Sequence, residues 1–524
     1  MIQPNLSNLD NTDNYLLFPI SNNKEYEIFI IANDSYLFPS LFQMETIGGL
    51  IVIKTKATKT KIKLNINEIV SIVTDEDYDE EYINSIKIKL LNRYPSKKHQ
   101  ELFVNKKYAK IFYYPKISYK ECNLINLFKC SKNKKIFTEK ETRVKRVMEI
   151  LISAKYLNEL QEELHKAISY ECKANNLSNY SGSGMLISQN AFPKRKIYII
   201  VNPHSSHYSN SILYQAINFF KCANLPFDII HTSRKNNAKT FIQNLDFEPY
   251  DGIIACGGDG LLHEIINGIY NRKDYKDFID KISIGILPCG KNNSFAYSIA
   301  KESNEEYKSE TFSFIIAKGI TKTIDIQQVE LMNDNADERQ YIYSLSNIAF
   351  YESASLIKDS KNPNRDHSFN SYFAYLPFCS DFDIKKIPTV NHRITGLKDM
   401  HHSKEMYSFF FASNITYMNS NTKMTSKALL NDGYCDIITM KENGNNKLSS
   451  FLSTYAHEGN YFDENDKLKN DIGIEYIKTK SFRLKIESDD PVECLIDGEE
   501  YTFKSLQVKT MKQAIKVYCF NNSK

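Results

Sequence analysis

The sequence predicts an α/β domain with a parallel sheet, followed by an antiparallel β-sandwich domain and preceded by a smaller β-rich domain. Three observations carry this prediction. Apolar strands alternate with amphipathic helices from about residue 194 to 300, strand-rich sequence follows from about 325, and residues 25–120 contain short runs with alternating polarity. A chain of 524 residues is long enough to form about two to four domains.

The bulk composition narrows the class of protein. A formal net charge of +4 is small for this length and argues against a dedicated nucleic-acid binder. The 10 cysteines include no Cys-x-x-Cys pair, so we expect neither a zinc ribbon nor a disulfide framework, but free thiols inside the cell. The first residues do not resemble a signal peptide, and no stretch approaches the roughly 18 apolar residues of a membrane span. Any membrane contact is therefore expected to be peripheral.

We expect residues 1–165 to form the β-rich domain. Residues 50–56, 61–66 and 85–90 alternate apolar and polar side chains, which is the pattern of half-buried strands. From 139 to about 164 the apolar residues have helical spacing, which predicts a closing helix. Strands closed by one helix would suit a barrel of the pleckstrin-homology type that helps membrane recruitment. Residues 166–193 are polar, include Ser-Gly-Ser-Gly, and are predicted to be a linker.

Residues 194–325 are predicted to form the α/β domain. The segment 196–201 is almost continuously apolar, as expected of a parallel strand that is buried on both faces. Helical patterns at 212–220 and 238–245 alternate with strands at 227–230 and 251–256. This β-α-β-α-β order is typical of nucleotide-binding domains, whose ligands bind at the carboxyl ends of the strands.

The third of these strands leads into Gly257-Gly258-Asp259-Gly260, and a helical pattern begins directly afterwards. Glycines allow a ligand to approach the backbone closely, and the amides of a helix start favour an anion such as phosphate. A carboxylate in such a turn would repel phosphate, so we interpret Asp259 as a proton acceptor or a metal-linked group. The turn lacks the third glycine of the dinucleotide fingerprint, and the chain has no Walker motif. Taken alone, the turn is equally well explained as purely structural.

Residues 326–524 are predicted to form the sandwich, with a C-terminal return to the α/β domain. Strand patterns occur at 340–345, 407–411, 435–439 and 481–486.

Five separated motifs occur in a fixed order. They are Asn202-Pro203, Thr-x-Arg-x-Asn-x-Ala at 232–238, Gly-Gly-Asp-Gly-x-x-x-Glu-x-x-Asn-Gly at 257–268, Pro-x-Gly-x-x-Asn at 288–293, and Asp-Gly-Glu at 497–499. Together they resemble the diacylglycerol kinase catalytic family over about 194–520, with the best match to sphingosine (long-chain base) kinases. The resemblance implies the two-domain fold shared by diacylglycerol and NAD kinases.

The resemblance implies an ATP- and Mg²⁺-dependent lipid kinase that transfers the γ-phosphate to the primary hydroxyl of a sphingoid base, giving its 1-phosphate. Asp259 matches the catalytic carboxylate. Such an enzyme would be cytoplasmic and peripherally associated with intracellular or plasma membranes. Ceramide kinase shares much of this layout. A ceramide or diacylglycerol kinase, or a pseudokinase that only binds lipid, therefore remains an alternative. An NAD-kinase-like enzyme shares the glycine turn, but the last two motifs argue against it.

The resemblance also assigns site residues by position. It places lipid contacts at Gly257, Glu352 and Ser355, and a metal contact at Asp497. ATP is expected against Asn202, Pro203, His204, Thr232, Ser233, Arg234, Lys235, Asn236, Gly258, Gly260, Glu264, Gly290, Lys291, Asn292, Asp497, Gly498 and Glu499.

The chain departs from the family pattern in three places. The glycine-rich tail usual after the first motif is replaced by residues 204–207, His-Ser-Ser-His. Lys291 and Asn292 replace a small hydroxyl residue and a glycine. The acidic residue for a lipid amine falls nearest Ser355, and the expected phosphate-binding arginines are out of register. Outside the motif positions we expect His263 to be a surface or helix-cap residue, and Cys256 and Cys289 to be small apolar fillers.

Overall fold

The computed structural model divides the chain into two compact units, which we describe separately. The first comprises 1–185 with 222–224, and the second comprises 186–221 and 225–524. In the first unit the structure describes residues 25–33, 40–47, 50–55, 61–65, 68–74, 88, 106–122, 137–153, 157 and 222–223. In the second it describes 195–221, 225–332, 339–351, 377–385, 401–441 except 421, 451–456, 459–464, 468–469, 473–486 and 492–520.

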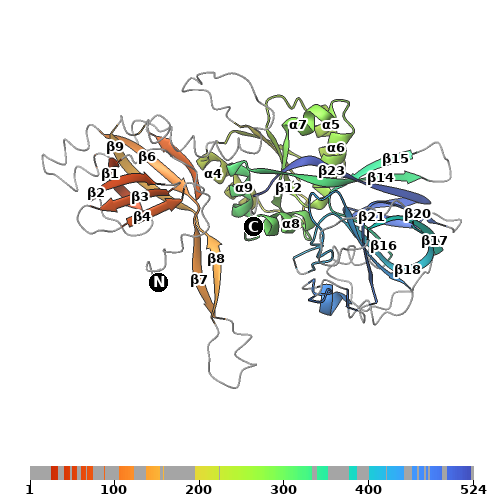
Figure 1. Cartoon of the computed structure of the whole chain (residues 1–524). Coiled ribbons are helices and arrows are strands. Elements are labelled where there is room, and N and C mark those ends of the chain that lie inside the picture. The colour runs from red at the N-terminus through yellow and green to blue at the C-terminus, as the bar shows by residue number, and fades with distance from the viewer. Residues whose placement is uncertain are drawn as a thin grey trace, which may run out of the picture. The chain divides into compact units, whose positions relative to one another are not determined.

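The first unit contains an antiparallel sheet of seven strands in the order β4-β3-β2-β1-β9-β6-β5 (Figure 1). A separate hairpin pairs β7 with β8. The strands are β1 (Glu25–Asn33), β2 (Ser40–Ile47), β3 (Leu50–Thr55), β4 (Lys61–Asn65), β5 (Ile69–Thr74), β6 (Lys106–Tyr113), β7 (Lys116–Cys122), β8 (Phe137–Arg143) and β9 (Arg146–Ser153). The unit is β-rich, as predicted, whereas its assignment to the pleckstrin-homology type stays a prediction.

The predicted closing helix is wrong over its first half. Two strands, β8 and β9, occupy residues 137–143 and 146–153, and β9 pairs with β1 on one side and β6 on the other. A central strand can be apolar at successive positions, and such a run has no period that separates it from a buried helix. The β-branched residues Val147, Ile150 and Ile152 were the signal that favoured a strand. Apart from Leu157, residues 154–164 lie outside the described part of the chain.

The second unit begins with the predicted α/β fold. Its parallel strands have the order β11-β10-β12-β13, and helices flank them on both sides (Figure 1). The elements are β10 (Ile197–Val201), α4 (Asn210–Cys222), β11 (Phe227–His231), α5 (Asn237–Asn244), β12 (Gly252–Gly257), α6 (Asp259–Tyr270), α7 (Tyr275–Lys281), β13 (Ser283–Pro288), α8 (Ser294–Glu302) and α9 (Ser309–Lys318). Within the described residues, no helix is both long and apolar enough to cross a membrane.

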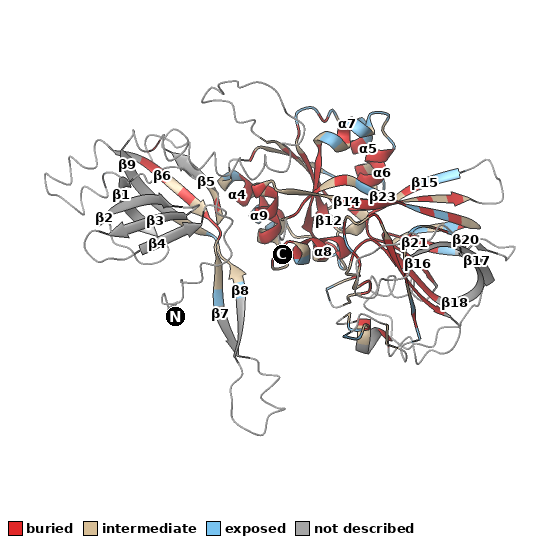
Figure 2. Ribbon diagram, viewed as in Figure 1, coloured by how far each residue is buried: buried red, intermediate tan, exposed pale blue. Residues whose placement is uncertain are grey.

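The central parallel strands form the core of this α/β part. Every residue of β12 and β13 is buried, which explains why these segments are apolar without alternation (Figure 2). On one side Phe219 of α4 meets Phe314 of α9 edge to face, and on the other Phe247 packs against Phe278 of α7. Burial on both faces fixes the strand ends, and the loops that follow them form the site.

The strand-rich part follows as predicted. It contains β14 (Thr321–Met332), β15 (Arg339–Ser344), β16 (Asn347–Tyr351), β17 (Pro377–Lys385), β18 (His401–Ser413), β19 (Cys435–Lys441), a π-helix (Phe451–Ala456), β20 (Glu475–Ile486), β21 (Val492–Ile496), β22 (Glu499–Phe503) and β23 (Ser505–Tyr518). The last strand, β23, pairs in parallel with β13 and antiparallel with β14 and β20. The end of the chain therefore joins the α/β part and the strand-rich part into one hydrogen-bonded network.

The strand-rich part has apolar side chains on both faces of β18. Phe410 and Ala412 belong to a first apolar cluster, whereas their neighbours Phe409 and Phe411 belong to a second, because successive strand residues point to opposite faces. The second apolar cluster consists of Ala349, Phe409, Phe411, Met418, Met424, Ile438, Met440, Phe451, Ala456, Tyr461, Ile474 and Leu495. This second cluster matters for function, because Met418 also reaches the site described next.

Candidate active site

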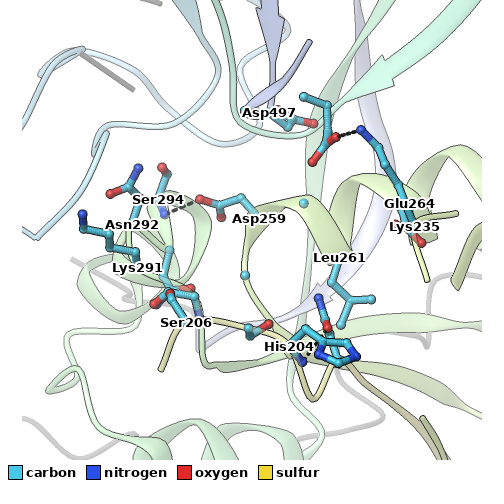
Figure 3. A pocket seen from close by; sticks show the side chains of 18 of the residues that line it. His204, Ser206, Lys235, Asp259, Leu261, Glu264, Lys291, Asn292, Ser294 and Asp497 are labelled. Carbon is cyan, nitrogen blue, oxygen red and sulfur yellow. Dashed lines mark hydrogen bonds and ion pairs between the residues drawn. The ribbon is translucent and has the colours of Figure 1, made fainter. Parts of the chain in front are cut away.

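A pocket of about 470 Å³ lies where the carboxyl ends of the parallel strands face the turn between β21 and β22 (Figure 3). Four loops of the α/β part contribute to its wall, one after each of β10, β11, β12 and β13. The pocket therefore lies at the edge of the sheet where ligands of such folds bind.

Most of the residues that the sequence assigned to the site line this pocket. They are Asn202, His204, Thr232, Arg234, Lys235, Gly258, Asp259, Gly260, Glu264, Gly290, Lys291, Asn292, Asp497, Gly498 and Glu499. Pro203, Ser233, Asn236 and Gly257 belong to the same loops but are not part of its lining. Glu352 and Ser355 lie outside the described residues. The individual roles of all these residues stay predictions.

The pocket also has lining residues that the sequence reasoning did not assign. They are Ser205, Ser206, Leu261, Asn293, Ser294, Asn347 and Met418. Asn293 had a signal, since it is the last residue of Pro-x-Gly-x-x-Asn. Asn347 and Met418 had none, because they reach the pocket from strand-rich segments that carry no motif.

Asp259 is the first residue of α6, and its carboxylate turns toward the start of α8. It accepts hydrogen bonds from the backbone amides of Ser294 at 2.8 Å and Phe295 at 3.2 Å (Figure 3). Burial raises the pKa of the Asp259 carboxyl above its ordinary value of 3.8, the two amides offset part of this effect, and the nearby charge of Asp497 adds to it. The result is a fixed carboxylate whose affinity for a proton is increased.

Asn293 holds the loop beside Asp259 in shape. Its backbone adopts a left-handed conformation with φ 46°, which asparagine tolerates better than most residues. Its side-chain oxygen accepts the amide of Gly290 at 3.0 Å, and its side-chain nitrogen donates to the Gly290 carbonyl and to the Tyr307 hydroxyl. These three bonds make Gly290 to Ser294 a compact turn before α8.

Glu264 shapes the loop that follows β11. Its two carboxylate oxygens accept the backbone amides of Asn236 at 2.9 Å and Ala238 at 3.0 Å, around the start of α5. Asn237 accepts the amides of Ser233 and Arg234 from within the same loop. These contacts present Arg234 and Lys235 at the pocket wall and account for Glu264 without a nucleotide.

Asp497 forms a hub between the two parts of the second unit. It and Gly498 have φ values of 53° and 83° and form the two-residue turn between β21 and β22, for which Asp-Gly is well suited. Its carboxylate accepts five hydrogen bonds, from the Ser344 hydroxyl, the His263 ring and the amides of residues 345, 346 and 347. These donors already bond to both carboxylate oxygens, and the expected metal ligation by Asp497 stays a prediction.

These five hydrogen bonds give the carboxyl of Asp497 a pKa shift opposite to that of Asp259. Burial raises its pKa, but hydrogen bonds and charge from His263, with the bonds from Leu345 and Ser344, outweigh burial and hold the pKa below its ordinary value. His263 is itself buried and contacts the Tyr501 hydroxyl at 2.8 Å through its other ring nitrogen. The expectation that His263 lies at the surface is wrong, since α6 turns this face toward the strand-rich part.

Lys235 and Glu499 close one side of the pocket with an ion pair of 2.5 Å (Figure 3). Lys235 comes from the loop after β11 and Glu499 begins β22, so the pair links the α/β part to the strand-rich part. The hydrogen bond to Glu499 raises the pKa of Lys235, which is otherwise largely solvent-exposed. A ligand phosphate could compete with Glu499 for this cation.

The described residues contain no group of three or more His, Cys, Asp or Glu side chains arranged to hold a metal ion. Two pocket carboxylates nevertheless have few contacts: Asp259, with two backbone amides, and Glu499, paired with Lys235. Mg²⁺ bound together with nucleotide phosphates usually needs one or two protein carboxylates and several waters. These two residues fit such an ion.

The fold and the pocket thus define a class of nucleotide-binding α/β proteins that are extended by a strand-rich part. A profile of the diacylglycerol kinase catalytic domain matches residues 196–329. The resemblance noted from the motifs is therefore confirmed for this part of the chain.

Curated relatives point in the same direction. "Sphingoid long chain base kinase 4" of Schizosaccharomyces pombe is 24% identical over 350 residues, which cover 60% of this chain and 73% of that protein. "Sphingosine kinase 2" of Homo sapiens is 43% identical over 77 residues, covering 15% of this chain and 12% of that protein. "Ceramide kinase" of Homo sapiens is 27% identical over 190 residues, covering 34% of each chain. The chain thus matches only minor parts of the two human proteins.

Solved structures of related fold are more distant. The crystal structure of a diacylglycerol kinase from Bacillus anthracis is 16% identical, with a TM-score of 0.44, and the match covers 62% of this chain and 97% of that chain. The crystal structure of yeast NADH kinase complexed with NADH has a TM-score of 0.35 and 10% identity, covering 66% and 92%.

Proposed function

We propose that this protein is an ATP-dependent lipid kinase that phosphorylates the primary hydroxyl of a sphingoid base. The observation that carries the proposal is the position of Asp259. It lies in one pocket with the glycine turns after β12 and β13 on one side and with Met418 of the second apolar cluster on the other. A base between a phosphate site and an apolar surface suits phosphoryl transfer to a lipid alcohol.

Asp259 would take the proton of the attacking hydroxyl. A carboxylate with a raised pKa is a better proton acceptor than a solvated one, and a positioned base contributes about 10²–10⁴-fold to the rate. The two amides of α8 fix its oxygens before substrate binds. The acceptor hydroxyl therefore meets a base that needs no reorientation.

The phosphates of ATP would lie against backbone amides and cations. The start of α6 and the Gly290 turn supply glycine backbone at the pocket wall, and Arg234, Lys235 and Lys291 supply positive charge. Lys291 stands where the family has a small hydroxyl residue, so this chain adds a cation at the turn. Mg²⁺, when bound beside Asp259 and Glu499, would supply further neutralisation of phosphate charge.

The lipid would enter from the strand-rich side. The Ser294 hydroxyl donates to the Met418 carbonyl at 2.6 Å, while the Ser294 amide binds Asp259, so Met418 is held next to the base. Asn347 lines the same pocket, and its buried side-chain oxygen has no hydrogen-bond partner in the described structure. A hydroxyl or ammonium group of the lipid head could satisfy this oxygen, which a hydrocarbon could not.

The relatives support this substrate class without fixing one lipid. Their printed names include sphingoid long chain base kinase, sphingosine kinase and ceramide kinase. The substrate is tested by incubating the purified chain with ATP and Mg²⁺ against sphingosine, ceramide, diacylglycerol and NAD. We expect the highest kcat/KM with sphingosine. Faster turnover of ceramide or diacylglycerol would replace the substrate, and lipid binding without any transfer would identify a pseudokinase.

The mechanism is tested with Asp259→Asn. We expect kcat with sphingosine to fall by about 10²–10⁴-fold, because the amide cannot accept the proton. Asp246→Asn is the matched control, since Asp246 is an exposed carboxylate of the same α/β part that bonds only locally to the Glu248 amide. The control should keep its activity. Undiminished turnover in Asp259→Asn would refute the assigned base.

We also propose that the first unit recruits the enzyme to membranes from the cytoplasm. The support is its β-rich architecture, together with the need of a lipid kinase to reach substrate in a bilayer. Binding to sphingosine-containing phosphatidylserine vesicles can be compared between the full chain and a chain without residues 1–165. We expect binding to weaken on deletion, and unchanged binding would contradict the proposal.

A further inference from the structure

Two buried thiols lie next to each other beneath the pocket. The sulfurs of Cys256 and Cys289 are 3.6 Å apart, and neither side chain has any exposed surface. Cys256 is the last residue but one of β12, and Cys289 directly follows β13. The glycine turn with Asp259 begins one residue after the first thiol, and Gly290 follows the second.

The backbone of this cysteine pair connects three of the pocket loops. The Cys289 amide donates to the Gly257 carbonyl at 2.8 Å. The Cys256 carbonyl accepts the Asn202 amide at 3.0 Å, and the Cys289 carbonyl accepts the His207 amide at 2.9 Å. Any change in the separation of the two sulfurs therefore acts directly on the loops after β10, β12 and β13.

The pair is unusual among the thiols of the chain. The cysteines whose side chains the structure describes are all free thiols: Cys222, Cys256, Cys289, Cys435, Cys494 and Cys519. Within this set, Cys256 and Cys289 are the two whose sulfurs contact each other, whereas Cys435 contacts Gln327 and Cys519 contacts Ser303. The reading of these two residues as simple fillers accounts for their burial but not for their pairing.

We propose that Cys256 and Cys289 form a reversible disulfide when the protein meets a hydroperoxide, and that this cross-link alters the pocket. A disulfide has an S–S length of about 2.05 Å, so the two sulfurs need to approach by roughly 1.5 Å from their present contact. Gly258 and Gly290 line the cavity one or two residues away, and neither places a side chain between cavity and thiols.

The two thiols would have different roles in the oxidation. The hydrogen bond from Cys256 lowers the pKa of the Cys289 thiol against the effect of burial, whereas the same bond and burial both raise the pKa of Cys256. Cys289 is therefore the attacking thiolate. Its sulfur bonds to one peroxide oxygen and the O–O bond breaks. The leaving hydroxide, or alkoxide from an organic hydroperoxide, takes the proton that Cys289 lost and becomes water or alcohol.

The second step closes the disulfide. The Cys256 sulfur attacks the sulfenic sulfur of Cys289, the S–O bond breaks, and the Cys256 proton leaves with the hydroxide as water. In sum, two thiols are oxidised by two electrons and one hydroperoxide is reduced. A dithiol reductant reverses the change by exchange.

The cross-link would displace Asp259, because the glycine turns after β12 and β13 are in close contact. A Cβ added at Gly290 would meet the Gly258 Cα at 2.6 Å, so the two glycine turns already pack against each other. Pulling Cys256 and Cys289 together must therefore shift the turns along each other. A displacement of about 1 Å at a reacting group can lower turnover about 10²-fold. This consequence rests on the proposed kinase function, whereas disulfide formation does not.

The test treats the reduced full chain with hydrogen peroxide, blocks remaining thiols with iodoacetamide after denaturation, and searches the digest for a linked peptide. We expect a Cys256–Cys289 link that dithiothreitol removes, with kinase turnover reduced about 10²-fold and then restored. Alkylation of both residues after peroxide treatment would overturn the proposal. Because the link is read by mass, its failure is distinct from a failure of the kinase assignment.

Variants separate this pair from general oxidation. Cys256→Ala and Cys289→Ala should each lose the linked peptide and keep their turnover after peroxide. Cys494→Ala is the matched control, because Cys494 is equally buried but lies in the first apolar cluster of the strand-rich part, and it should behave as the parent chain. A disulfide that leaves turnover unchanged would refute the effect on the pocket.

Discussion

Two aspartates line the same pocket, each in a turn with glycine, and the protein gives them opposite properties. Asp259 accepts two backbone amides, and its pKa is raised. Asp497 accepts five donors, among them His263, and its pKa is lowered. Asp497 is buried and Asp259 is half-buried, and burial raises the pKa of both. The opposite outcome therefore comes from the number and charge of their hydrogen-bond donors.

The comparison separates a reactive carboxylate from an organising one. A carboxylate with few donors is held in place but retains affinity for a proton, as a general base requires. A carboxylate that is saturated by donors has little left for substrate or metal, and it instead fixes the segments that bond to it. Asp497 thereby joins α6, which begins with Asp259, to the turn that presents Glu499. Sequence motifs alone gave both residues a direct role in the reaction.

The largest effect on stability is expected from Asp497→Asn. The amide group would place a donor against donors that now bond to the carboxylate, leaving buried groups without partners. We expect the free energy of unfolding to fall by about 3 kcal/mol, which should lower the midpoint of the transition of the second unit by roughly 4 °C in thermal unfolding followed by circular dichroism. Asp259→Asn should change the same midpoint far less, because its charge is disfavoured in the folded state.

Asp432→Asn is the matched control for this experiment, since Asp432 also precedes a glycine in a turn of the strand-rich part. Its partly exposed carboxylate pairs with Lys478 at 2.7 Å and accepts the Tyr434 amide. We expect a smaller loss than in Asp497→Asn, because Lys478 keeps its ion pair with Asp436 at 3.2 Å. Equal losses in Asp432→Asn and Asp497→Asn would show that turn geometry, and not the buried hub, determines the stability.

The α/β part could be predicted because its signals are local. Buried parallel strands are continuous apolar runs, and glycine turns mark the strand ends, so β10 to β13 and the pocket loops follow from the sequence. The motif Asp-Gly-Glu was also found from a local pattern, because its Asp-Gly pair forms the two-residue turn of a hairpin. The sequence pattern contained the turn, but not the five donors that come from α6, β15, β16 and the turn between these two strands.

The other features of the site could not be predicted, because they depend on tertiary contacts that leave no local pattern in the sequence. Met418 and Asn347 reach the pocket from a loop and a strand start, and nothing in their neighbours marks them. His263 has a polar side chain in a helix start, which suggests the surface, yet Asp497 and Tyr501 give it partners in the interior. The strand β9 failed for a further reason, because its run Ile150-Leu151-Ile152 is apolar at successive positions and such a run has no period that separates a strand from a buried helix.

A smaller effect is expected on how the stability of the fold depends on pH, and here too the two aspartates differ. Since burial raises the pKa of Asp259 above 3.8, the folded protein binds its proton at a higher pH than the unfolded chain does. Acidification from neutral pH toward 3.8 therefore removes an unfavourable buried charge, and this residue makes the fold relatively more stable as pH falls. Asp497 has the opposite sign. Its contribution is complete above 3.8 and is lost only as pH falls through its lower folded value.

The pH dependence of kinase activity should follow the ionisation of Asp259, and the stability of the fold in acid should follow the ionisation of Asp497. Below the raised pKa of Asp259, kcat/KM with sphingosine should decline about tenfold per pH unit, because only the ionised base accepts the proton. In the same range the unfolding midpoint of the parent chain should approach that of Asp259→Asn, since both then carry a neutral side chain. The measurement is a series of kinase assays and thermal unfolding curves between neutral pH and about pH 4. A parent midpoint that lies above that of Asp259→Asn at neutral pH, by an amount that stays constant toward pH 4, would show instead that Asp259 is stabilised as a carboxylate, as Asp497 is.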